Sequence, residues 1–176
     1  MEKTSRIATM FLWSAIAQGA IIAAVTFIIF IWGSIYLSPS PSMVIASGSA
    51  GIWLTVGYVM YIIMVLALGV TSFLYDYIEV RLGKRLDRFS AILARVHLVL
   101  MNSGMIGAAL LLMYAGYVGG VGLMPSAIGG GGLTQLQVHE QILGQYPLPI
   151  IAFVVATIVG IISGGISYLR SLLRKP

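Results

Sequence analysis

The chain has 176 residues, of which 59% are hydrophobic and 9% charged, and its mean hydropathy is +1.01. Soluble domains carry roughly 25% charged residues, so this composition excludes an ordinary soluble domain and indicates an integral membrane protein. The lack of cysteine excludes disulfides and thiol catalysis, and the ten basic residues, with a net charge of +5, stand in separate groups that make no continuous nucleic-acid surface.

Four apolar stretches are long enough to cross a hydrocarbon core, which needs ~20 helical residues. They are residues 7–37, 52–75, 91–119 and 148–169. We predict an all-α polytopic membrane protein, with four transmembrane helices in one bundle and a single transmembrane domain over residues 1–176. Pro39 and Pro41 should end the first helix and Gly83 the second. Gly119 and Gly120 should end the third.

The basic residues fall on one side of this arrangement. They are Lys3 and Arg6 before the first span, Arg81, Lys84, Arg85, Arg88 and Arg95 around the second connection, and Arg170, Arg174 and Lys175 after the fourth span. The connections 38–51 and 120–147 contain no Lys or Arg. The positive-inside rule therefore predicts that both termini are cytoplasmic. We expect an integral protein of the cell membrane. Tyr75, Tyr77 and Tyr168 should then lie near the inner interface.

The outer loop over residues 120–147 is long, almost uncharged and contains four consecutive glycines, 129–132. The following segment, 133–143, has apolar residues at spacings compatible with a short interfacial helix. We interpret the loop as a flexible glycine tether followed by that helix. An equally good alternative is a loop buried against neighbouring subunits, since so apolar a loop is unfavourable in water.

Only Arg95 and His97 are ionisable residues inside a predicted span, and such residues are expensive in lipid. His97 shares a helical face with Met101, Gly104 and Ala108, and a face so rich in small residues should contact another helix. The His97 imidazole could hydrogen-bond a neighbouring helix, bind heme or a metal, or relay protons. His139 belongs to the outer loop on the opposite side, so a bis-histidine heme would need His97 from a second copy.

Charged residues next to the second and third spans suggest ion pairing. Arg95 can extend to the cytoplasmic interface and pair with Asp76 or Glu79. The simplest interpretation of this group is a solvated hairpin that sets topology, and the alternative is docking of anionic lipid or a partner.

Small residues at helix-packing spacing recur in the last two spans. Gly160 and Gly164 form a GxxxG motif, and Gly104 with Ala108 repeats the pattern, so these faces should bind helices within the bundle or between chains. The sequence has no phosphate-binding loop, no nucleophile with its base and no paired intramembrane carboxylates. Catalysis by this chain and a metal site within it are therefore not expected.

The segment Ala94–Gly104 (ARVHLVLMNSG) resembles a helix of the catalytic subunits of heme-copper oxidases and nitric oxide reductases, which reads His-x-His before apolar residues and a glycine. Residues 116–125 are similar to the Gly- and Pro-containing turn that follows a later helix there. The resemblance covers about thirty residues and implies that His97 matches the ligand of the low-spin heme. Arg95 stands at the position of the high-spin ligand, and the copper-ligand histidines are missing.

This resemblance implies an accessory role in a redox membrane complex. We predict a small noncatalytic subunit of a respiratory assembly of the heme-copper-oxidase type, with other membrane subunits and the lipid bilayer as its partners. Three alternatives stay open: an accessory subunit of a membrane metal-dependent monooxygenase, a homo-oligomeric electron carrier that binds heme b through His97, and a small transporter or channel.

Overall fold

The computed structural model describes residues 5–174, so Lys3 and Lys175 lie outside the described residues. Its four long helical segments are apolar enough to cross a membrane. They are α1 (Arg6–Thr26) with the π-helical η1 (Phe27–Trp32) and α2 (Gly33–Tyr36), α4 (Gly51–Asp76) with the π-helical η2 (Tyr77–Arg81), α5 (Arg88–Leu123), and α7 (Pro147–Leu173). No strand occurs in this part of the chain. The all-helical class and four helices of membrane-spanning length and hydropathy are thus confirmed for the described residues.

The connections contain short helices, of which the sequence predicted only the one after the glycines. They are α3 (Pro41–Ala46), η3 (Ser126–Ile128), α6 (Gln135–Gln141) and η4 (Leu143–Gln145). Proline at its first position and the Ser40 hydroxyl, which accepts a bond from the Met43 amide, start α3. The predicted helix after the glycines is present as α6, whose Thr134 and Gln137 form a reciprocal capping box.

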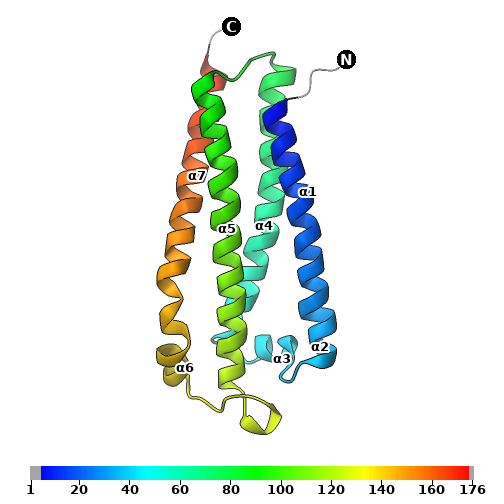
Figure 1. Ribbon diagram of the computed structural model, residues 1–176, viewed down its shortest axis with the longest axis vertical. Helices are drawn as coiled ribbons and strands as arrows, with labels where there is room; N and C mark the ends of the chain where they lie inside the picture. The colour runs from blue at the N-terminus through cyan, green and yellow to red at the C-terminus, as the bar shows by residue number, and fades with distance from the viewer. Residues whose placement is uncertain (1–4, 175–176) are drawn as a thin grey trace.

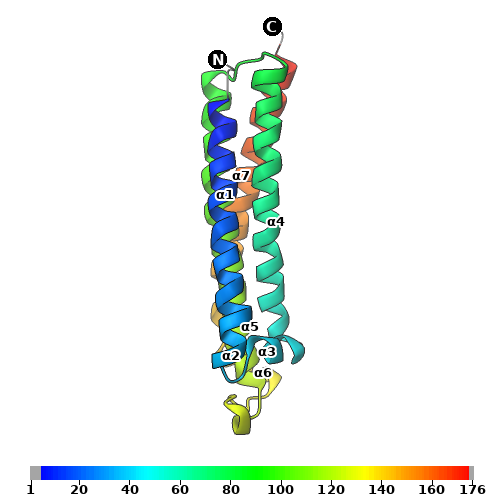
Figure 2. The ribbon, with the colours of Figure 1, turned by 90° about the vertical axis from the view of Figure 1, so that its right-hand side faces the viewer.

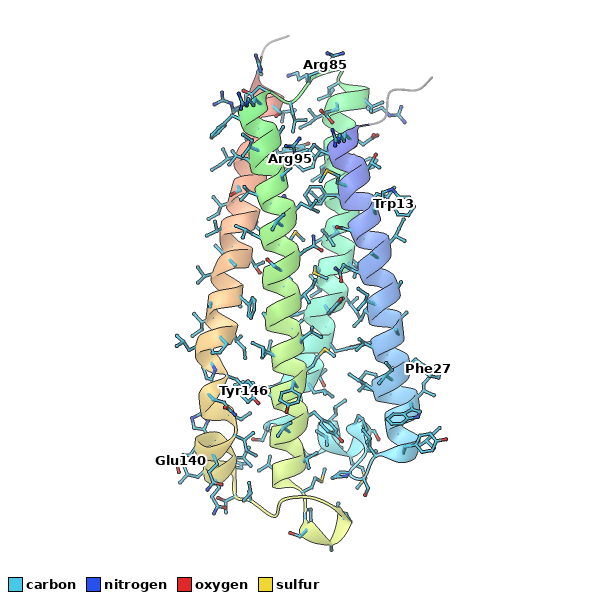
Figure 3. All side chains as sticks on the ribbon, in the orientation of Figure 1. Trp13, Phe27, Arg85, Arg95, Glu140 and Tyr146 are labelled. Atoms are coloured by element: carbon cyan, nitrogen blue, oxygen red, sulfur yellow. The ribbon has the colours of Figure 1, made fainter. Side chains whose placement is uncertain are left out.

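The four long helices follow one another in the order α1, α4, α5, α7 (Figure 1), their axes are nearly aligned, and neighbours in this order run in opposite directions (Figures 1 and 2). The most extensive contacts join α5 to α7 and to α4, and α1 packs mainly on α4, with only marginal contact to α5. α1 and α7 occupy opposite sides of the row in Figure 1. The side chains on the outside of the row are large and apolar, as lipid requires; Trp13 is 64% and Phe27 56% exposed (Figure 3).

The third long helix corrects one predicted end. α5 runs through Gly119 and Gly120 to Leu123 and ends just before Pro125. These glycines lie inside the helix because neighbouring groups come too close for a side chain: a Cβ at Gly119 would lie 2.9 Å from that of Ala50, and one at Gly120 would overlap Val44. Glycine therefore serves close helix packing here, and proline ends the helix.

The glycine segment of the outer loop is bonded to the end of α5 and is not a free tether. The amides of Gly131 and Gly132 donate to the carbonyls of Val121 and Met124, at 3.0 and 2.7 Å. Gly129 has φ of +86° and Gly132 of +64°, which L-residues with a Cβ rarely adopt. The glycines allow this tight reversal, which brings α6 against α5.

The start of α1 and the end of α7 lie at the same end of the molecule (Figure 1). Arg85 and Arg95 lie at that end, and Glu140 and Tyr146 lie at the other (Figure 3). The connection that is rich in basic residues and the long connection that lacks them therefore lie at opposite ends of the molecule.

Candidate functional site

His97 lies in the third turn of α5 and is buried, with 8% of its surface exposed. The residues that the helical period places on its face, among them Met101, Gly104 and Ala108, are buried too. This face contacts α7, and the prediction that its small residues meet another helix is confirmed.

The GxxxG motif of α7 makes its contacts inside the chain. Gly160 lies against Leu100 and Met101, where an added Cβ would come within 3.0 Å of both. Gly164 lies directly against the His97 ring, so that a Cβ there would overlap the imidazole. Of the two interpretations of this motif, packing within the chain is the one found, and Gly164 leaves the space that His97 occupies.

Two aromatic side chains complete the surroundings of His97. The Phe11 ring of α1 lies 5.2 Å from the imidazole and stacks on Tyr75 of α4 at 5.5 Å. Tyr75 is 1% exposed, so its ring lies inside the helix packing. The stacking on Phe11 holds it inside, on the same face of α4 as the buried Met64 and Leu68.

Two polar atoms of this cluster lack partners among residues 5–174. Nδ1 of His97 and the Tyr75 hydroxyl oxygen are both buried and meet no partner at hydrogen-bonding geometry; Nδ1 lies against Gly164, and the Tyr75 hydroxyl lies beside the Ser167 side chain. Buried polar atoms are almost always hydrogen-bonded, and leaving one unpaired costs roughly 1–3 kcal/mol. These two atoms, whose rings both contact Phe11, mark this cluster as the candidate site.

A cavity of about 380 Å³ lies beside these groups, between α4, α5 and α7. It is lined by Ala67, Thr71, Leu74 and Tyr75 of α4, His97 and Met101 of α5, and Ile161, Gly164, Gly165, Tyr168 and Leu169 of α7. Its walls are mostly apolar, and a Cβ added at Gly165 would meet nothing within 4 Å. We call this space the α4–α7 cavity.

The α4–α7 cavity offers few ligands for heme or a metal. His97 and Met101 are one turn apart on the same helix face, so they cannot bind opposite sides of one iron. His139 is exposed in α6, at the end of the molecule remote from His97. No group of three or more His, Cys, Asp or Glu side chains within the described range could hold a metal ion.

The predicted pairing of Arg95 is not found. Within residues 5–174 no ion pair joins Arg95 to Asp76 or Glu79; Arg95 is exposed, and Glu79 accepts a hydrogen bond from the Ser5 hydroxyl. Arg95 is exposed, whereas Ala94 and His97 beside it on α5 are buried.

The ion pairs at this end of the molecule are made by Asp87 instead. Asp87 caps α5 by accepting from the Ser90 amide at 2.8 Å, and it accepts from Arg170 of α7 at 3.1 Å. Arg174 lies 3.6 Å away. The hydroxyl and amide of Ser90, followed by the Arg170 guanidinium, lower the pKa of the Asp87 carboxyl to about 2. This carboxylate thus ties the start of α5 to the end of α7.

Two polar contacts between α1 and α4 were not predicted from the sequence. The Tyr61 hydroxyl donates to Gln18 at 2.5 Å, and Thr26 and Tyr58 share a hydrogen bond of 2.8 Å. The signal was present in the sequence, since Tyr58 and Tyr61 are three residues apart and so share a helix face. Their partners lie some forty residues earlier, which the spacing alone does not reveal.

Comparison of the chain with protein-family models, with curated protein sequences and with solved structures gave no match.

Proposed function

We propose that the protein is a noncatalytic subunit of a larger redox complex in the cell membrane, of the heme-copper-oxidase type, with both termini in the cytoplasm. In this role the chain binds a transmembrane helix of a partner subunit and contributes no reacting group. The proposed orientation rests on the basic residues. Those that the structure describes all lie toward one end of the molecule's long axis.

The observation that carries the proposal is a pair of hollows along α1, each lined in part by α5, which we together call the groove. These helices touch only marginally, because α1 is held by α4. Near the charged end the groove is lined by Arg6, Thr9, Met10, Trp13, Ser14 and Ala17 of α1 and Leu98 of α5. Near the other end a cleft of about 360 Å³ is lined by apolar residues of both helices.

The groove suits a helix because its lining is mostly apolar and its two hollows follow one another along α1. Ala17 is exposed in it, and small residues let a second helix backbone approach closely. At the far cleft Val25, Trp32 and Leu110 leave a hollow for larger side chains. A partner helix laid here would contact both ends of the groove at once.

The resemblance of Ala94–Gly104 to an oxidase helix supports the type of complex. A transport path has less support, because Gln18 and Thr26, two of the few polar residues in the spans, are occupied by hydrogen bonds to α4. A path through the bilayer needs a continuous series of free polar groups.

The test is extraction of native membranes in mild detergent, separation on a native gel and mass spectrometry of what migrates with the chain. We expect comigration with a heme-containing oxidase core. Ala17→Leu, which fills the groove, should release the chain from that core, and Ile16→Leu, a conservative change at the adjacent exposed residue, should not. Migration of the wild-type chain without any redox subunit would refute the proposal.

A further inference from the structure

A basic hollow lies at the charged end of the molecule, where the start of α5 and the end of α7 are side by side (Figure 1). It has a volume of about 430 Å³ and is lined by Asp87, Arg170, Leu173 and Arg174. We call it the α5–α7 hollow, and we propose that it binds the headgroup of an anionic phospholipid. The site belongs to this chain alone and does not depend on the partner subunit proposed above.

The arginine side chains of the α5–α7 hollow have open surface and donors for an anion. The side chains of Arg170 and Arg174 are 54% and 60% exposed. Arg170 donates to Oδ2 of Asp87 through Nε and Nη2, which leaves Nη1, and Arg174 approaches that oxygen only to 3.6 Å, beyond hydrogen-bonding distance. Guanidinium groups bind phosphate through such donors. Because two arginines face one carboxylate, the hollow has an excess of positive charge.

The hollow keeps its shape through contacts that do not involve Arg174. The Lys84 ammonium group donates a hydrogen bond to the Leu172 carbonyl near the end of α7. The Arg170 guanidinium lies over the Phe89 ring of α5, 5.1 Å from its centre. These contacts hold the end of α7 against the start of α5. Arg174 is therefore the arginine of the hollow that can be changed without loosening this junction.

The surroundings of the hollow favour a lipid over a soluble anion. On α5, Phe89 is exposed beside Arg170, and Ile92, one turn further along, is exposed too. On α7, Ile166 precedes Arg170 by one turn and Ile162 precedes Ile166 by another, and both are exposed. Both helices thus continue from the arginines as apolar strips. An acyl chain can lie along these strips while its phosphate meets the guanidinium groups.

The charge balance at this end of the molecule favours an anionic headgroup over a zwitterionic one. Basic residues outnumber acidic ones there among residues 5–174: Arg6, Arg81, Lys84, Arg85, Arg88, Arg95, Arg170 and Arg174 against Asp76, Glu79 and Asp87. A zwitterionic headgroup has a positive amine next to its phosphate, and this excess of positive charge repels the amine. An anionic headgroup has no such amine to be repelled, and basic residues near a membrane surface attract it.

The experiment titrates the purified full-length chain in detergent with phosphatidylglycerol, or with phosphatidylcholine of the same acyl chains, and measures bound lipid by native mass spectrometry. We expect phosphatidylglycerol to bind about tenfold more tightly than phosphatidylcholine. Glycerol phosphate, which has the anionic group without acyl chains, should not displace it.

Arg174→Gln is the decisive variant and should weaken phosphatidylglycerol binding about fivefold, with phosphatidylcholine binding unchanged. Arg85→Gln is its matched control, because it removes the same charge from the same end of the molecule but does not line the hollow (Figure 3). Asp87→Asn should act in the opposite direction and strengthen phosphatidylglycerol binding, since asparagine still caps α5 and no longer repels the phosphate.

Equal affinity for the two lipids, or equal effects of Arg174→Gln and Arg85→Gln, would show diffuse attraction without a site and overturn the proposal. Weaker phosphatidylglycerol binding by Asp87→Asn would show that charge does not recognise the lipid and would overturn it too. Displacement by glycerol phosphate would show a site for a soluble anion, with the same consequence. None of these results depends on comigration with an oxidase core.

Discussion

At the residue scale, the sequence identified His97 correctly as the buried ionisable group of the spans, and the structure shows what surrounds it. The helical period was enough to place His97 with Gly104 and Ala108, because one α-helix has a fixed repeat. Tyr75 and Phe11 could not be predicted, since they come from two other helices. The predicted pairing of Arg95 was not found for a related reason. The length of its side chain allowed an ion pair with Asp76 or Glu79, and only the rotation of α5 about its axis decides where that side chain lies.

Gly164 should be far more sensitive to substitution than the adjacent Gly165. In Gly164→Ala the new methyl group overlaps the His97 ring, so the unfolding free energy should fall by about 1–3 kcal/mol, the usual cost of overpacking. Gly165→Ala meets nothing and should leave stability unchanged or slightly higher. The measurement is the unfolding midpoint in mixed micelles on titration with sodium dodecyl sulfate.

The cause can be isolated with a double variant. His97→Ala in the Gly164→Ala background removes the ring that the methyl group meets, so the two changes should be non-additive. Equal losses in Gly164→Ala and Gly165→Ala would contradict the contact between Gly164 and His97.

At the element scale, the spans were predictable because the hydrocarbon core sets a minimum apolar length. Their ends were predictable only where one residue dominates, as Pro39 does after α2. The helix end predicted at Gly119 and Gly120 was wrong. A glycine can end a helix or allow a neighbouring helix to approach closely, and which of the two occurs here depends on the packing of α4 and its preceding connection against α5. The short helix α3 lies where the sequence offered only a connection, and its Val44 is buried against α5.

Asp87 joins two elements, and its ionisation should make that junction sensitive to acid. Its pKa of about 2 lies below the ordinary 3.8, so folding favours the carboxylate. The stabilisation is complete above the ordinary pKa and is lost as the pH falls from about 4 through about 2. Asp87→Asn should remove this part of the pH dependence.

The measurement is the unfolding midpoint from neutral pH down to about 2 for the wild type and Asp87→Asn. Glu140→Gln, which changes an exposed carboxylate at the other end of the molecule, serves as the control. Parallel curves for the wild type and Asp87→Asn would show that the contacts with Ser90 and Arg170 contribute nothing to folding.

At the scale of the whole molecule, the row of four helices leaves two different lateral faces. One is the groove of α1 and α5, proposed for a partner helix, and the other opens into the α4–α7 cavity. The order of the helices in the row follows from which pairs pack most closely, and α5 lies inside because its small residues face α4 on one side and α7 on the other.

The orientation across the membrane can be tested directly, because the chain has no cysteine of its own. Single cysteines in Arg85→Cys and Glu140→Cys lie at opposite ends of the molecule (Figure 3). A membrane-impermeant maleimide added to intact cells should label Glu140→Cys and should label Arg85→Cys only after permeabilisation. The reverse pattern would show that the positive-inside rule fails for this chain.

The helical class, the four long apolar helices and the common end for the basic residues follow from the sequence, because hydrophobic length and charge act within each segment. Tertiary structure alone decided the helix order, the position of α3, the folding of the glycine loop onto α5 and the meeting of Phe11, Tyr75, His97 and Gly164. These features depend on contacts between residues far apart in the chain. A segment's own periodicity shows which face is turned inward, and the identity of the group that meets it depends on how all four helices pack.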